Sequence, residues 1–155
     1  MEIEKRRVYA IVDFDALDQN VQAMEEKLPQ DVGMMAVIKT NAYGHGAKAI
    51  AKHLEDNDRI SGYAVATAEE ALELRKAGIG KMILILGYVP PQRAAEVSRL
   101  RLSLTLTSYD QACQLDQTGF AIDAHLPVDT GMHRLGEAAE DLDAIVRYYS
   151  LSHLR

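Results

Sequence analysis

Met82-Ile-Leu-Ile-Leu86 is an apolar run of strand length, and it decides the fold because similar runs recur along the chain. The others are residues 33–38, 62–66, 102–106 and 121–126. From residue 62 onward they start about twenty residues apart, which leaves room for one helix in each interval. Strands that alternate with helices of this length are joined by right-handed crossovers into a parallel sheet. The sequence therefore predicts the α/β class.

Helix signals fill the intervals. Residues 67–70 (Thr to Glu) and 108–111 (Ser to Gln) have the spacing of capping boxes, and Gly78 and Gly119 lie where left-handed caps end helices. Apolar residues at helical spacing predict three further helices: Leu17, Val21, Met24 and Leu28; Ala47, Ile50, Ala51 and Leu54; Leu142, Ile145, Val146 and Tyr149.

Five βα units fit either an open doubly wound sheet or the first part of an eight-stranded barrel, and periodicity does not separate the two. A closed barrel takes about 250 residues, whereas this chain has 155. Residues 148–155 follow a predicted helix without a Pro, Gly or polar tail. We therefore expect a chain that stops inside a larger fold.

Composition indicates a soluble globular protein, with 48% apolar and 26% charged residues. The formal net charge of −6 opposes binding to nucleic acid. No apolar stretch approaches the roughly 18–20 residues of a membrane span, and residues 1–7 lack the apolar region of a signal peptide. Cys113 is the single cysteine, so no internal disulfide can form. We expect a cytoplasmic protein with neither nucleic acid nor membrane as a partner.

Ala36-Val-Ile-Lys-Thr-Asn-Ala-Tyr-Gly-His-Gly46 places Lys39 at the carboxyl end of a predicted buried strand, directly before a glycine-rich turn. Active sites of parallel α/β folds lie at that end. Apolar surroundings disfavour the ammonium form, which leaves an amine able to attack a carbonyl. The alternative is a lysine whose charge simply reaches solvent, and position alone favours that alternative.

Two motifs change this balance. Residues 37–46 closely resemble the cofactor-lysine signature of the alanine racemase family, and Val128-Asp-Thr-Gly-Met-His-Arg-Leu-Gly136 resembles its substrate-arginine motif. The resemblance implies a partial (β/α)8 TIM-type barrel with parallel strands, of which the chain supplies about the first five βα units. Residues 1–155 would then be the N-terminal part of the cofactor-binding barrel, without the family's C-terminal β-domain.

The resemblance also implies a cofactor, pyridoxal 5'-phosphate, and roles for three residues. Lys39 would hold the cofactor and transfer a proton on the D-amino-acid face of the substrate. Tyr43 would hydrogen-bond the cofactor phosphate. Arg134 would lie near the phenolic oxygen of the cofactor and bind the substrate carboxylate, a role that suits a planar fork of donors.

Two positions depart from the family pattern. Pro127 stands where many relatives have a lysine that orients the arginine, and His133 stands where glycine is common. The family's second catalytic base, a tyrosine of the partner subunit, belongs to the C-terminal β-domain. We therefore expect a homodimeric parent enzyme and an inactive 155-residue chain. The five histidines lack the spacing of a zinc site, so no metal is expected.

The reaction implied is the interconversion of L-alanine and D-alanine, which supplies a precursor of cell-wall peptidoglycan. Two alternatives stay open. The substrate could be another small amino acid such as serine, because a methyl and a hydroxymethyl differ little in size. The chain could also be a non-catalytic pyridoxal-phosphate-binding barrel, although the motif around Arg134 is a feature of the racemases.

Overall fold

The computed structural model describes residues 8–155. Residues 1–7, where a signal peptide was judged absent, lie outside the described part. The chain divides into two compact units, residues 1–33 and 34–155. The first contains helix α1 (Phe14–Glu25), which begins at a capping residue, because Asp13 Oδ1 accepts a hydrogen bond from the Ala16 amide at 3.1 Å.

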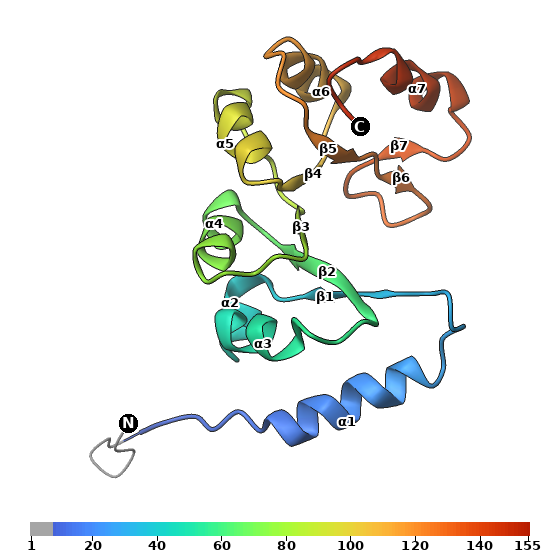
Figure 1. Cartoon of the computed structure of the whole chain (residues 1–155). Helices are drawn as coiled ribbons and strands as arrows, with labels where there is room; N and C mark the ends of the chain where they lie inside the picture. Colours follow the sequence, from blue (N-terminus) through green and yellow to red (C-terminus); the bar gives the residue numbers. More distant parts are fainter. Residues whose placement is uncertain (1–7) are drawn as a thin grey trace. The chain divides into compact units, whose positions relative to one another are not determined.

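The second unit alternates strands and helices as the sequence predicts (Figure 1). Its strands are β1 (Met34–Val37), β2 (Ile60–Val65), β3 (Met82–Ile85), β4 (Ser103–Thr105), β5 (Asp123–His125), β6 (Val128–Asp129) and β7 (Glu137–Ala138). Its helices are α2 (Lys39–Tyr43), α3 (Ala47–Leu54), α4 (Ala68–Lys76), α5 (Ala94–Arg99), α6 (Tyr109–Asp116) and α7 (Leu142–Val146), with 3-10 turns η2 (Pro91–Arg93) and η3 (Arg147–Ser150).

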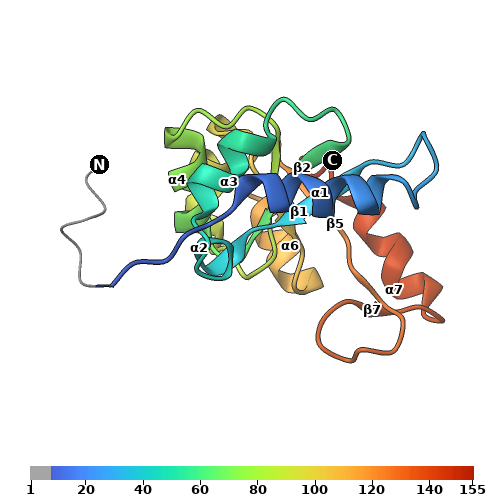
Figure 2. The same cartoon turned by 90° about the horizontal axis from the view of Figure 1, so that it is seen from below.

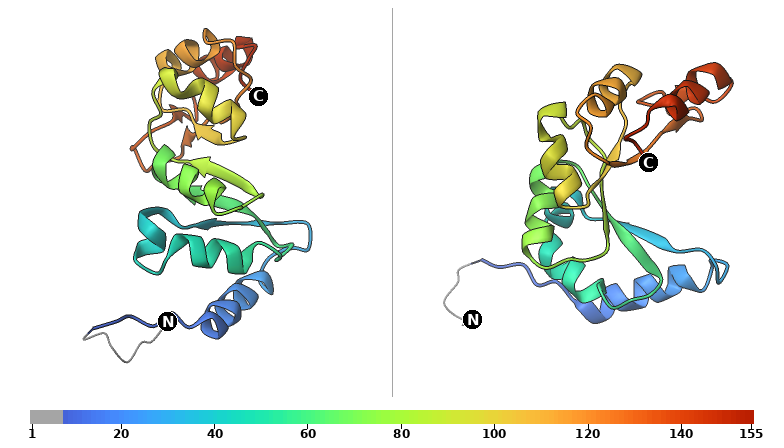
Figure 3. Two further views of the ribbon diagram at one scale, coloured as in Figure 1. Left: turned by 60° about the vertical axis from the view of Figure 1, so that its left-hand side comes forward. Right: turned by 45° about the horizontal axis from the view of Figure 1, so that its top comes forward.

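The five main strands form one parallel sheet in the order β1-β2-β3-β4-β5. Each strand lies beside the next in the sequence, without the reversal of order that defines an open doubly wound sheet. Figure 3 shows the strands turning relative to one another, the usual twist of a sheet. The order selects the barrel alternative: the fold is a partial α/β barrel.

Residues 142–155, which follow β5 and the Arg134 loop, do not form the helix that the sequence predicts. The sequence predicted a final helix that buries the stripe Leu142, Ile145, Val146 and Tyr149. Instead, α7 is short, Leu142 and Tyr149 are 67% and 85% exposed, and Tyr148 is the buried residue. The last residues are not helical: Leu154 forms a parallel bridge with Ile122 on the far side of β5 from β4.

Helices α3, α4 and α5 lie on one side of the strands (Figure 1), and Figure 2 shows α3 beside α4. Side chains on alternate strand positions are fully buried, including Tyr63, Ile83 and Leu104. Side chains on the opposite face of the sheet are buried at its middle, as at Leu84. At the edge strand β1 they are more accessible, and Val37 is 46% exposed. In residues 8–155 no helix is long and apolar enough to cross a membrane.

One arginine joins the connections that lead into β3 and β4. Arg75, in the last turn of α4, donates hydrogen bonds of 2.7 Å to the carbonyl oxygens of both Ile79 and Lys81. The same guanidinium donates to Leu100 O at 2.9 Å and to Arg101 O at 2.8 Å. Arg75 therefore fixes the amino-terminal edge of two neighbouring strands, opposite the edge that carries Lys39.

We predict that Arg75→Met lowers the free energy of unfolding of the protein by about 1–3 kcal/mol, because four carbonyl groups lose a charged donor together. Thermal unfolding measures the effect. Lys76→Met is the matched control, since Lys76 is exposed on the same helix turn. Equal melting temperatures for the two variants would contradict the prediction.

Candidate active site

Lys39 lies at the carboxyl edge of the sheet, although not on the strand itself. Strand β1 ends at Val37, Ile38 is 4% exposed, and Lys39 is the first residue of α2. The predicted strand ran to Ile38, so β1 ends one residue earlier than expected. Lys39 is partly exposed, and within residues 8–155 its Nζ makes neither a hydrogen bond nor an ion pair. Its amine is therefore available to a ligand.

The backbone after Lys39 is strained. Thr40, Asn41, Ala42 and Tyr43 all have φ between 51° and 55°, so α2 turns in the left-handed sense. A left-handed turn costs about 1–2 kcal/mol for each residue other than glycine. Strain of this kind persists only where the surrounding structure imposes it, and it gathers at functional sites.

Several hydrogen bonds hold this turn in place. The Ala42 amide donates to Ile38 O at 2.8 Å, and Asn41 Oδ1 accepts from the Ala47 amide at 3.0 Å. The ring Nδ1 of His45 lies 2.9 Å from Ala42 O. Gly44, with φ of 92°, ends the left-handed run at a position where a residue without Cβ is unstrained.

Tyr43 closes the same turn. Its side chain is 60% exposed, and among the described residues it has no hydrogen-bond partner. The structure thus places Lys39 and Tyr43 on one short left-handed turn. It places Arg134 elsewhere, in the loop between β6 and β7, so the candidate residues lie beyond the ends of β1 and β5, the two outer strands of the five-stranded sheet.

The Arg134 loop runs from β6 to β7, and Asp129 organises it. Asp129 Oδ1 accepts from the amides of Gly131 at 2.9 Å and His133 at 3.0 Å, while Oδ2 lies 3.0 Å from His133 Nδ1. The amides of His133 and then Gly131 lower the pKa of the Asp129 carboxyl. His133 has φ of 55°, a conformation in which glycine would be unstrained. The histidine is held there by its pairing with Asp129.

The far end of the loop also has a tight contact. The Glu137 amide donates to Pro127 O at 3.1 Å, and a Cβ on Gly136 would lie only 2.9 Å from that oxygen. A side chain at position 136 would therefore push β7 from β6. Pro127, which stands in the place of a lysine in many relatives, contributes its carbonyl group to the loop. Arg134 itself is exposed and has no partner among residues 8–155.

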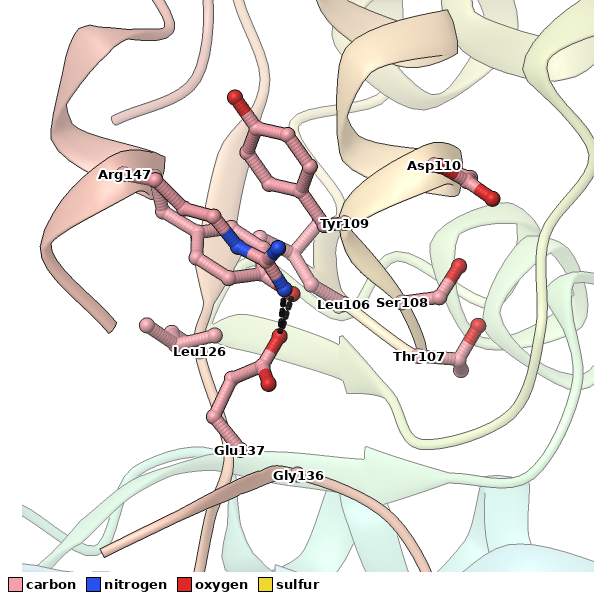
Figure 4. A pocket seen from close by; sticks show the side chains of 10 residues that line it. Leu106, Thr107, Ser108, Tyr109, Asp110, Leu126, Gly136, Glu137 and Arg147 are labelled. Atoms are coloured by element: carbon pink, nitrogen blue, oxygen red, sulfur yellow. Dashed lines mark hydrogen bonds and ion pairs between the residues drawn. The ribbon is translucent and has the colours of Figure 1, made fainter. Parts of the chain in front are cut away.

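A polar cluster beside this loop was not expected from the sequence (Figure 4). Glu137 Oε1 accepts from the Tyr148 hydroxyl at 2.6 Å and from Arg147 Nη2 at 2.8 Å. The Arg147 guanidinium lies 4.2 Å from the centre of the Tyr109 ring. These bonds, that of Tyr148 first, lower the pKa of Glu137, and burial raises the pKa of Tyr148. The cluster ties β7 to α6 and η3.

The cluster lines a cavity of about 340 Å³ at the carboxyl ends of β4 and β5. Its other walls are residues 106–110, Leu126 and Gly136. No local pattern marks Glu137 or Arg147, because they are ten residues apart and meet through the fold. No group of three or more His, Cys, Asp or Glu side chains within residues 8–155 is placed to hold a metal ion.

The sequence matches the family described as alanine racemase, N-terminal domain, over residues 12–155. The chain belongs to this family. An alanine racemase of Streptococcus agalactiae is 38% identical over 134 residues, which are 84% of this chain and 36% of that protein. A serine/alanine racemase of Enterococcus gallinarum is 41% identical over 139 residues, which are 90% of this chain and 20% of that protein.

Solved structures agree with the family. The crystal structure of alanine racemase from E. faecalis superposes with a TM-score of 0.83 and 33% sequence identity, over 93% of this chain and 40% of that one. This racemase N-terminal domain therefore spans between a fifth and two fifths of the length of these relatives.

We predict that the Arg134 loop loosens only in strong acid. The pKa of Asp129 is lowered in the folded chain, so its carboxylate stabilises the loop above its ordinary pKa of 3.8 and loses this effect as pH falls through the lower folded value. Nuclear magnetic resonance of glycine-labelled natural-length protein should show the Gly131 amide titrating below pH 3.8. Asp129→Asn should abolish that titration, and a midpoint above 3.8 would contradict the prediction.

Proposed function

We propose that this chain is the cofactor-lysine part of an alanine racemase that uses pyridoxal 5'-phosphate. The observation that carries the proposal is Lys39, with an unpartnered amine, on a strained turn at the carboxyl edge of a parallel barrel. In this proposal the protein is a cytoplasmic homodimer. It interconverts L-alanine and D-alanine for the supply of peptidoglycan precursors.

The residues present suit this cofactor. Pyridoxal phosphate offers an aldehyde, a phosphate and a phenolic oxygen. Lys39 would hold the cofactor through its amine, and no carboxylate in residues 8–155 is paired to that amine, so no ion pair would have to break first. The exposed hydroxyl of Tyr43, on the same turn, suits a phosphate oxygen, and the guanidinium of Arg134 suits a carboxylate.

The proposed mechanism divides the work between cofactor and chain. When bound, pyridoxal phosphate supplies an electron sink for the pair left at the α-carbon. Lys39 holds the cofactor and moves a proton to and from that carbon on one face. Arg134 binds the substrate carboxylate and so sets which face Lys39 meets. Inversion needs a second proton-transferring group on the opposite face, which we assign to a tyrosine of the partner subunit.

A second candidate substrate is serine. The relative from Enterococcus gallinarum, 41% identical over 139 residues, is named a serine/alanine racemase. Alanine and serine differ by one hydroxyl group, and a pocket that merely tolerates it discriminates weakly. The rates at which the natural-length protein racemises alanine and serine, measured by chiral separation of the products, distinguish the two substrates.

We predict that borohydride reduction of the cofactor-loaded, natural-length protein attaches the cofactor to Lys39. Lys39 is the lysine whose amine stands at the carboxyl edge of the sheet, whereas Lys48 and Lys52 lie on α3. Peptide mapping by mass spectrometry identifies the modified residue. Lys39→Ala is the control and should carry no label. A label on Lys48 or Lys52 would refute the assignment.

We predict that Arg134→Lys lowers turnover roughly tenfold or more while leaving the melting temperature unchanged. A single ammonium cannot reproduce the two parallel hydrogen bonds of a guanidinium, and a charge-assisted hydrogen bond contributes about 1.5–3 kcal/mol. Arg134 is exposed, and in residues 8–155 it makes neither a hydrogen bond nor an ion pair that would affect folding. Arg99→Lys, at another exposed arginine, is the matched control. Normal turnover with a lowered melting temperature would assign Arg134 a structural role instead.

A further inference from the structure

Glu70, in the first turn of α4, reaches two strand ends at once. Its Oε1 accepts a hydrogen bond of 2.6 Å from the Thr40 amide, and its Oε2 accepts one of 2.7 Å from the Ala66 amide. Thr40 directly follows Lys39, and Ala66 directly follows β2. One carboxylate therefore bridges the backbone at the carboxyl ends of β1 and β2.

This contact differs from a capping box, for which residues 67–70 have the right spacing. One half of the box is present, because Thr67 Oγ1 accepts from the Glu70 amide at 3.3 Å. In a capping box the Glu side chain would return to the amide of the capping residue. Here it bonds instead to the residue before the cap and to Thr40, thirty positions away.

Gln111 occupies the same position in α6 as Glu70 does in α4, and it makes a similar bridge with a neutral side chain. Gln111 Oε1 accepts from the Thr107 amide at 2.9 Å, and its Nε2 donates to Val89 O at 2.9 Å. The Thr107 hydroxyl also donates to Gln111 Oε1 at 2.9 Å, so Gln111 meets donors at its oxygen and an acceptor at its nitrogen, which suits an amide. Glu70 meets two N–H donors, and only a carboxylate offers an acceptor to each. The chemistry at position 70 therefore selects glutamate over glutamine.

The bond to Thr40 falls where the left-handed turn begins, with Thr40 at φ of 51°. A charge-assisted hydrogen bond is about twice as strong as a neutral one. It offsets part of the strain and fixes the backbone one residue after Lys39. Without it, the turn between Lys39 and Tyr43 would be free to relax toward unstrained conformations.

We infer that Glu70 is a positioning residue for Lys39: its carboxylate holds the strained turn so that the amine stands at the carboxyl edge of the sheet. The inference rests on the proposed function, in which Lys39 carries the cofactor. Glu70 acts through the backbone amides of Thr40 and Ala66 and is not itself required to touch cofactor or substrate.

The test uses Glu70→Gln in the natural-length protein, with Gln111→Ala as the matched control that cuts the equivalent brace at β3 and β4. Hydrogen exchange of the cofactor-free protein, read on peptides covering residues 39–43, should quicken about tenfold or more in Glu70→Gln. The dissociation constant for pyridoxal phosphate should rise by a similar factor. Gln111→Ala should lower the melting temperature without either change.

Glu70→Asp guards against loss of folding in Glu70→Gln. It keeps the charge on a side chain one carbon shorter, so it should retain the fold and still weaken cofactor binding, because both amides cannot be reached together. The inference is overturned if Glu70→Gln keeps the hydrogen exchange rate and the cofactor affinity of the wild type. If Glu70→Gln does not fold, the same result in Glu70→Asp overturns it. An equal loss of cofactor affinity in Gln111→Ala would also overturn the inference, because a general loss of stability would then explain the effect of the Glu70 variants.

The proposed function fails by a different result. If Lys39→Ala still retains cofactor after borohydride reduction, Lys39 is not the attachment point, and the role of Glu70 falls with it. If reduction labels Lys39 while the Glu70 variants behave as wild type, the function stands and only this inference falls.

Discussion

The hydrogen bond from the Thr40 amide to the Glu70 carboxylate, 2.6 Å long, is the contact on which the site most depends. It forms at the start of a left-handed turn of non-glycine residues, a conformation that the chain would leave if it were free to do so. The sheet makes this contact possible, because β1 and β2 are parallel neighbours and end at the same edge. A local strain is thus balanced by a contact between segments thirty residues apart.

The two edges of the sheet do different work. At the amino-terminal edge, Arg75 satisfies four backbone carbonyl groups and holds the connections into β3 and β4. At the carboxyl edge, Glu70 accepts hydrogen bonds from backbone amides, and the side chains of Lys39 and Tyr43 have no hydrogen-bond partner in residues 8–155. On the proposed function, residues for stability and residues for ligand binding lie at opposite ends of the strands, as is usual in parallel barrels.

The sequence predicted what local patterns encode. The structure contains the predicted strands, the helix starts at Thr67 and Ser108, and the left-handed caps at Gly78 and Gly119. Periodicity did not predict the left-handed turn or the partners of Glu70, because both depend on amides that only the fold brings near. The Glu137–Arg147 pair and the bridge of Leu154 to Ile122 were missed for the same reason.

The strand order gives the positions of Lys39 and Arg134 a functional meaning. Lys39 follows β1 and Arg134 follows β5, so three strands separate them in the sheet. In a closed barrel of eight strands, the first and the fifth stand on opposite sides of the mouth. On the proposed function, a substrate between them would have its carboxylate held from one side and its α-carbon reached from the other. The distance between Arg134 and Lys39 across the barrel mouth would then determine whether Lys39 reaches the proton on the α-carbon. On the same proposal, the hydrogen bonds of Glu70 and Asp129 would hold the two loops and so help to set that distance.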